Sequence, residues 1–144
     1  MSKVLILNGP NLGRLGVREP EIYGNTSYAE LTELCLVEAT KLGLEVEMRQ
    51  TDSEAQLVAW VHEAIDNEMP IVINAAAFTH YSYSLRDALA QSKFPVIEVH
   101  LSNPAAREEF RQVSVISAVC TGTISGFGPD SYRLALAALA RLRS

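Results

Sequence analysis

The chain has 144 residues, of which 48% are hydrophobic and 20% are charged, a balance typical of globular proteins. At this length one domain can bury roughly two-thirds of the surface that its unfolded chain exposes, so we expect a single domain over residues 1–144. Twelve Lys and Arg against seventeen Asp and Glu give a net charge of −5. This charge argues against nucleic acid as a partner, because proteins bind nucleic acids by neutralising their phosphates with Lys and Arg.

The first expected element is an apolar strand at residues 3–8. A stretch rich in Gly, Pro and Asn follows over residues 9–26, and loops of this length are usually functional, so we expect a lid there. Ser27 and Glu30 form a capping box, and apolar residues at helical spacing then continue a helix to Gly43.

Strands and helices keep alternating to the end of the chain. A short strand at 44–50 leads to a second capping box, Ser53 to Gln56, and to another amphipathic helix. Further strands are expected at 71–74, 96–100 and 118–124, and further helices at 82–91, at 104–111 and from Pro129 to about 142. Five strands separated by helices predict an α/β, flavodoxin-like, doubly wound fold: a five-stranded parallel sheet with helices on both faces.

Ligands of such folds bind at the carboxyl ends of the strands. Polar residues with useful chemistry gather at four of these ends, in residues 8–11, 74–80, 98–103 and 122–128. The sequence therefore places a candidate site on this edge of the sheet.

The long loop carries Arg18 and Tyr23, with Gly24 as a possible hinge. Neither the dinucleotide-binding nor the P-loop glycine signature fits it, which disfavours a phosphate-binding loop. The alternative is a solvated loop in which Arg18 and Tyr23 are incidental.

The fourth strand carries Glu98 and His100 on the same face, roughly 6–7 Å apart along the chain. A carboxylate near an imidazole, directly or through a neighbour, fixes the tautomer and supports acid–base chemistry. The alternative is a structural His–Glu pair.

The segment after this strand offers binding groups for an anion. Ser102 precedes an expected short helix whose N-terminal amides suit a carboxylate, although Ser102 could be only its N-cap. Arg107 and Arg111 are four apart, so one helical face would present both to a ligand. Pairing with Glu108 and Glu109 at the surface is the alternative.

The remaining histidines and the cysteines point to no metal. His62 fits the surface of a helix, whereas His80 follows a strand end and could touch a ligand. Cys35 and Cys120 are expected to be small buried thiols. No His, Cys or Asp spacing suits a metal site. No apolar run approaches the roughly 20 residues of a membrane span and no signal pattern opens the chain, so we expect a cytoplasmic protein without membrane contact.

Taken in order, six segments resemble the type II 3-dehydroquinate dehydratases. They are residues 8–16 (NGPNLGRLG), 18–24 (REPEIYG), Asn74 with Thr79 and His80, 85–88 (LRDA), 98–103 (EVHLSN) and 106–111 (AREEFR). The resemblance implies a flavodoxin-like fold, a homododecamer built as a tetramer of trimers, and no cofactor. It also implies conversion of 3-dehydroquinate to 3-dehydroshikimate and water, a step of the shikimate pathway to aromatic amino acids and, in some organisms, of quinate breakdown.

The resemblance further implies a role for each matching residue. Tyr23 would accept the proton beside the ketone, His100 would protonate the departing hydroxyl, and Arg18 would stabilise the transition state. Asn11 would hold the enolate through water, and Glu98 would be the partner of His100. Substrate contacts are implied for Asn74, His80, Asp87 (from a neighbouring subunit), Leu101, Ser102 and Arg111.

Two segments depart from the family pattern. Residues 75–78 (AAAF) stand where Pro or Gly and an aromatic or aliphatic residue are common, and residues 104–105 (PA) replace an aliphatic–His pair. These changes bear on loop geometry and leave every catalytic residue type in place.

Two other functions compete with this reading. A non-catalytic flavodoxin-like binding module would need a phosphate-cradling first loop or an acidic cluster, and a hydrolase would need a G-x-S-x-G turn; neither pattern is evident. A lysine Schiff base is not expected, because Lys3, Lys41 and Lys93 all fall where strands begin.

Overall fold

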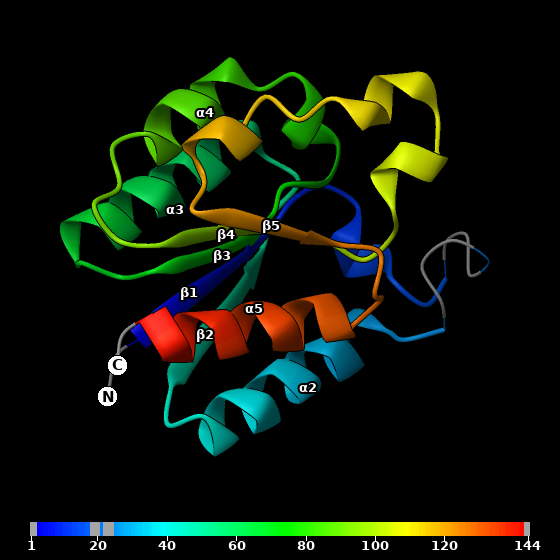
Figure 1. Cartoon of the computed structure of the whole chain (residues 1–144). Helices are drawn as coiled ribbons and strands as arrows, with labels where there is room; N and C mark the ends of the chain where they lie inside the picture. The colour runs from blue at the N-terminus through cyan, green and yellow to red at the C-terminus, as the bar shows by residue number, and fades with distance from the viewer. Residues whose placement is uncertain (1–2, 18–20, 22–24, 143–144) are drawn as a thin grey trace.

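A parallel five-stranded sheet forms the centre of the computed structural model, which describes residues 3–17, 21 and 25–142 (Figure 1). The strands are β1 (Lys3–Asn8), β2 (Glu45–Gln50), β3 (Ile71–Asn74), β4 (Val96–His100) and β5 (Gly122–Ser125). They lie in the order β2-β1-β3-β4-β5, and every neighbouring pair is parallel. This is the strand order of flavodoxin-like sheets, so the predicted fold is confirmed.

Helices cover both faces of the sheet. In Figure 1, α2 (Tyr28–Lys41) and α5 (Asp130–Leu142) lie on one face, and α3 (Glu54–Asp66) and α4 (Tyr83–Leu89) on the other. Because side chains alternate along a strand, β4 sends Ile97 and Val99 into the core under α2 and α5, and Val96 into the core under α3 and α4. The same alternation determines on which face of the sheet each polar side chain at a strand end lies.

The first predicted capping box is present, and the second is half formed. Ser27 Oγ accepts from the Glu30 amide and Glu30 Oε1 accepts from the Ser27 amide, each at 3.1 Å. Ser53 Oγ accepts from the Gln56 amide at 3.2 Å, but the Gln56 side chain accepts from the Thr51 hydroxyl instead of reaching back. Gln56 therefore ties α3 to the end of β2.

The prediction of a helix at 104–111 is wrong. Two short 3₁₀ turns, Pro104–Ala106 and Glu109–Gln112, replace it, and Arg107 between them has extended backbone (φ −110°, ψ −162°). No residue of either turn is buried, so this segment has no apolar stripe to dock as an α-helix.

The last strand is shorter than expected. The apolar run at 118–124 divides into a 3₁₀ turn, Ser117–Val119, and β5, which begins at Gly122. A further 3₁₀ turn, Ala76–His80, follows β3 and was not predicted. None of the helices in the described residues is long and apolar enough to cross a bilayer.

Candidate active site

An open pocket lies at the carboxyl ends of β1, β3 and β4, on the edge of the sheet that the sequence indicated. Residues that sequence analysis singled out line it: Asn11, Asn74, His80, His100, Leu101, Ser102, Arg107 and Arg111. The other lining residues are Pro10, Leu12, Ala76, Ala77 and Pro104. The fold thus brings together polar groups from three separate strand ends.

Two described residues of the expected site, Asp87 and Glu98, do not line this pocket. Arg18 and Tyr23 lie outside the described residues. Asp87 is an exposed residue of α4. Glu98 is buried and contacts His100, and both residues line an adjoining pocket.

Glu98 and His100 form a direct pair. His100 Nε2 lies 2.6 Å from Glu98 Oε2, and both residues are buried. The other carboxylate oxygen, Oε1, accepts from the hydroxyls of Ser117 at 2.5 Å and Ser114 at 3.2 Å. Burial by itself would raise the pKa of Glu98, but the hydrogen bonds from His100 and Ser117 outweigh it and hold that pKa below 4.5. A carboxylate anion therefore stands behind the imidazole.

The two serines are site residues that sequence reasoning missed. Ser114 and Ser117 lie between the turn Glu109–Gln112 and β5, Ser117 as the first residue of the turn Ser117–Val119, and no motif or periodicity marks them. Only the tertiary structure brings their hydroxyls into contact with Glu98.

The ionisation of Glu98 predicts an acid-sensitive part of the stability. Because the folded pKa is depressed, the stability that Glu98 contributes is fully present above its unfolded pKa of about 4.5 and is lost as pH falls through the lower folded value. We expect the free energy of unfolding to decline over this range in the unmodified protein and to decline less in Glu98→Gln. Urea unfolding at a series of pH values measures this, with the exposed Glu33→Gln as the matched control. Equal pH dependence in the unmodified protein and Glu98→Gln would contradict it.

The loop after β1 holds Asn11 in an unusual conformation. Asn11 is left-handed (φ 70°, ψ −3°), and its amide donates to Asp52 Oδ1 at 2.8 Å. Gln50 Nε2 donates to the same oxygen and to the Gly9 carbonyl, both at 3.1 Å. A Cβ on Gly9 would lie 2.4 Å from the Ala75 carbonyl oxygen, so only glycine allows this close approach. These contacts fix the loop against its neighbours at the pocket rim.

His80 is arranged as a neutral imidazole. Its Nδ1 lies 2.8 Å from the Val113 carbonyl oxygen, which can only accept, so Nδ1 carries the proton. Burial lowers the pKa of His80 and outweighs the hydrogen bond to Val113, which raises it; the charges of His100 and Arg111 also lower this pKa. The neutral ring keeps Nε2 as an acceptor for a ligand.

The expected helix N-terminus at Ser102 is absent. Asn103, not Ser102, caps the following turn, because Asn103 Oδ1 accepts from the Ala105 amide at 3.1 Å. A turn of three residues presents no helical anion site, so that interpretation is wrong. Ser102 still lines the pocket, and its hydroxyl accepts from Arg107 Nη1 at 3.4 Å.

The two arginines reach the pocket without sharing a helical face. The extended backbone at Arg107 separates it from the turn that carries Arg111, yet both side chains are mostly buried and line the pocket. Glu108 contacts both, at 3.8 Å from Arg107 Nε and 3.2 Å from Arg111 Nε, so the predicted pairing with Glu108 is also present. The guanidinium groups suit a carboxylate ligand.

The groups at this pocket suit acid–base chemistry on an anionic ligand. It combines a buried carboxylate–imidazole pair with two guanidinium groups, amides and hydroxyls. Within the described ranges, no group of three or more His, Cys, Asp or Glu side chains is placed to hold a metal ion.

Comparison with known proteins gives a consistent result along almost the whole chain. The family model described as "Dehydroquinase class II" matches residues 2–140. A 3-dehydroquinate dehydratase of Salinispora tropica is 59% identical over 138 residues, which are 96% of each chain, and one of Mycobacteroides abscessus is 55% identical over 133 residues, 92% of each chain.

Solved structures agree with the sequence relatives. The type II dehydroquinase of Propionibacterium acnes has a TM-score of 0.96 and 54% identity, covering 98% of this chain and 97% of that one. The type II dehydroquinase of Butyrivibrio crossotus has a TM-score of 0.94 and 44% identity, covering 96% and 97%.

Proposed function

The chain belongs to the class II dehydroquinase family, and we propose that it is a lyase that dehydrates 3-dehydroquinate to 3-dehydroshikimate through an enolate, in the shikimate pathway. The observation that carries the proposal is the buried His100–Glu98 pair at the wall of a pocket that Arg107 and Arg111 also line. The pair supplies an acid, and the guanidinium groups supply charge for the substrate carboxylate.

The first step takes the proton beside the ketone. Tyr23 in its phenolate form accepts this proton, and Arg18 stabilises the phenolate, because a phenol with its ordinary pKa near 10 is a poor base at neutral pH. The electron pair of the broken C–H bond becomes an enolate, which Asn11 holds through a water molecule. We propose that the loop over residues 9–26 brings these three groups to the substrate.

The second step expels the hydroxyl. His100 gives a proton to the departing oxygen, the C–O bond breaks, and the enolate electrons close the new C=C bond, so that water and a conjugated enone result. The anionic Glu98 lies 2.6 Å from Nε2 and stabilises the imidazolium that exists before this transfer. Asn74, His80, Leu101, Ser102 and Arg111, which line the pocket, bind the ring and its carboxylate.

A non-catalytic flavodoxin-like binding module, the alternative from sequence, is not favoured. Family membership and an acid–base pair at the ligand edge of the sheet both point to catalysis. A binding module has no need of a buried His–Glu pair there.

The direct test is a spectrophotometric assay. Purified protein mixed with 3-dehydroquinate, with no added metal or nucleotide, should generate the ultraviolet absorbance of a conjugated enone. Unchanged absorbance from neutral to mildly alkaline pH would reject the proposed function.

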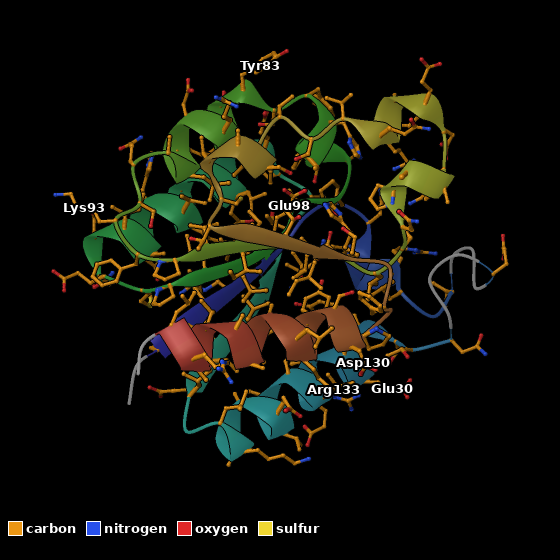
Figure 2. The ribbon with its side chains drawn as sticks, in the orientation of Figure 1. Glu30, Tyr83, Lys93, Glu98, Asp130 and Arg133 are labelled. Carbon is orange, nitrogen blue, oxygen red and sulfur yellow. The ribbon has the colours of Figure 1, made fainter. Side chains whose placement is uncertain are left out.

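We expect catalysis to proceed without a Schiff base. Lys3 opens β1, Lys41 ends α2 and Lys93 lies just before β4, so all three are at the end of the sheet where strands begin, as Figure 2 shows for Lys93. The pocket is at the opposite end. Borohydride added with substrate should leave no adduct, and a variant with all three lysines replaced by Arg should keep its activity. A lysine-linked adduct in the mass spectrum would overturn the mechanism and the position of the site.

We propose that the active unit is a homo-oligomer, a dodecamer of four trimers, in which Asp87 completes a neighbouring subunit's pocket. Asp87 is exposed on α4 and does not line the pocket of its own chain. Exposed apolar side chains near the pocket, Tyr81, Phe110 and Val113, offer a surface for such a neighbour.

This proposal predicts that substrate affinity depends on assembly. A variant made monomeric by charged substitutions at Tyr81 and Phe110 should bind 3-dehydroquinate weakly, and Asp87→Ala should weaken binding while the protein stays assembled. Calorimetric titration and light scattering measure the two properties. Full affinity in a verified monomer would contradict the role of Asp87.

We propose that this enzyme is cytoplasmic and forms a single catalytic domain. Cys35 and Cys120 are both unbridged, and burial raises the pKa of each thiol to about 12. Unbridged cysteines fit a reducing compartment.

A further inference from the structure

A buried chain of hydrogen bonds runs beneath the pocket. Asn8 and Asn74 are the last residues of β1 and β3, they pair in register, and both are buried. They lie on the sheet face that packs against α5, and from this helix the fully buried Tyr132 reaches both amides. The Tyr132 hydroxyl donates to Asn8 Oδ1 at 2.6 Å and accepts from Asn74 Nδ2 at 3.0 Å.

Backbone groups anchor both ends of this chain and fix its direction. At one end, Asn8 Nδ2 donates to the Arg49 carbonyl oxygen at 3.1 Å, and a carbonyl can only accept. At the other end, Asn74 Oδ1 accepts from the Ala76 amide at 3.2 Å, and an N–H can only donate. Rotating the Asn8 amide by half a turn would place two acceptors opposite each other, and rotating the Asn74 amide would place two donors opposite each other. Each Asn therefore has one allowed orientation, and the Tyr132 proton has one acceptor.

We propose that Tyr132 and Asn8 are positioning residues that hold the Asn74 amide in one orientation toward the substrate. The inference rests on the proposed function, since Asn74 lines the pocket in which the substrate would bind. Held in this way, Asn74 keeps its second Nδ2 proton and the second lone pair of Oδ1 for the substrate. The site therefore presents a fixed pattern of one donor and one acceptor, which suits a ring hydroxyl.

The donors and acceptors in this series of hydrogen bonds do not change with pH. Burial raises the pKa of Tyr132 far above its ordinary value of 10, and this outweighs the opposing hydrogen bond from Asn74. The phenol stays protonated, and neither Asn8 nor Asn74 titrates. Asn74 therefore keeps the same donor and acceptor directed at the pocket as the pH changes.

Tyr132→Phe tests the inference, because it removes the shared hydroxyl and keeps the ring that packs in the core. We expect KM for 3-dehydroquinate to rise about tenfold, as for a lost hydrogen bond, with kcat changed by less than about twofold. In an Asn74→Ala background the same substitution should not raise KM further, because Tyr132 acts only through Asn74. A crystal structure of Tyr132→Phe should show the Asn74 amide rotated or in more than one rotamer.

Cys35→Ala is the matched control. Cys35 packs in the same apolar cluster as Tyr132, so this change weakens the core without touching either amide. It should leave KM unchanged. If Tyr132→Phe does not fold, Asn8→Ala breaks the same chain at its other partner and should raise KM in the same Asn74-dependent way.

The outcomes separate the two claims. Unchanged KM and an unmoved Asn74 in Tyr132→Phe would overturn the inference, and so would an equal rise of KM in the Asn74→Ala background. If the unmodified protein shows no turnover, the proposed function fails, while the position of Asn74 in the crystal structure still decides whether Tyr132 holds it.

Discussion

Replacing His100 by alanine is expected to lower kcat by about 10² to 10⁴, the range for removing a general acid. Without the imidazole, the hydroxyl would have to depart as hydroxide beside the buried Glu98 carboxylate, which opposes developing negative charge. Proton removal by Tyr23 does not need His100, so exchange of the proton next to the ketone should survive. Turnover is measured by enone absorbance, and exchange by deuterium uptake in heavy water followed by mass spectrometry.

His62→Ala is the matched control for this variant, because His62 lies exposed on α3, away from the pocket. It should keep the kcat of the unmodified protein. If His100→Ala dehydrates the substrate at an unchanged rate, another group is the acid. If both exchange and dehydration stop while substrate still binds, His100 has a role in the first step as well.

Tyr23→Phe is expected to abolish turnover, with a loss of at least about 10² to 10⁴ in kcat, because it removes the base and keeps the aromatic ring. Unlike His100→Ala, it should stop proton exchange too, since no enolate forms. The dissociation constant of 3-dehydroquinate should change by less than about twofold, which calorimetric titration measures. Comparable turnover or exchange in Tyr23→Phe would rule Tyr23 out as the base.

The sequence predicted the centre of the site because simple periodicities govern it. Residues two apart on a strand share a face, and this rule alone brought Glu98 and His100 together. The edge of the sheet that holds ligands follows from the parallel strand order, so Asn11, Asn74 and Ser102 were expected near one another.

The rest of the site lies in irregular segments whose sequences have no strand or helix periodicity. Residues 104–112 carry apolar and charged residues that look helical, but they have no buried apolar stripe and form two 3₁₀ turns. Arg107 and Arg111 therefore reach the pocket by an irregular path. Ser114 and Ser117, the partners of Glu98, come from a neighbouring stretch of the same kind.

By itself, the sequence determined the fold class, the ligand edge and the acid–base pair, because each depends on local spacing and on the general geometry of parallel sheets. Only the tertiary structure decided which groups complete the site. Tyr132 lies 124 residues from Asn8 in the chain, and no sequence pattern relates a phenol on the last helix to amides on two strands. They meet because burial forces each polar group to find a partner, and the packing of α5 against the sheet determines which partner is within reach.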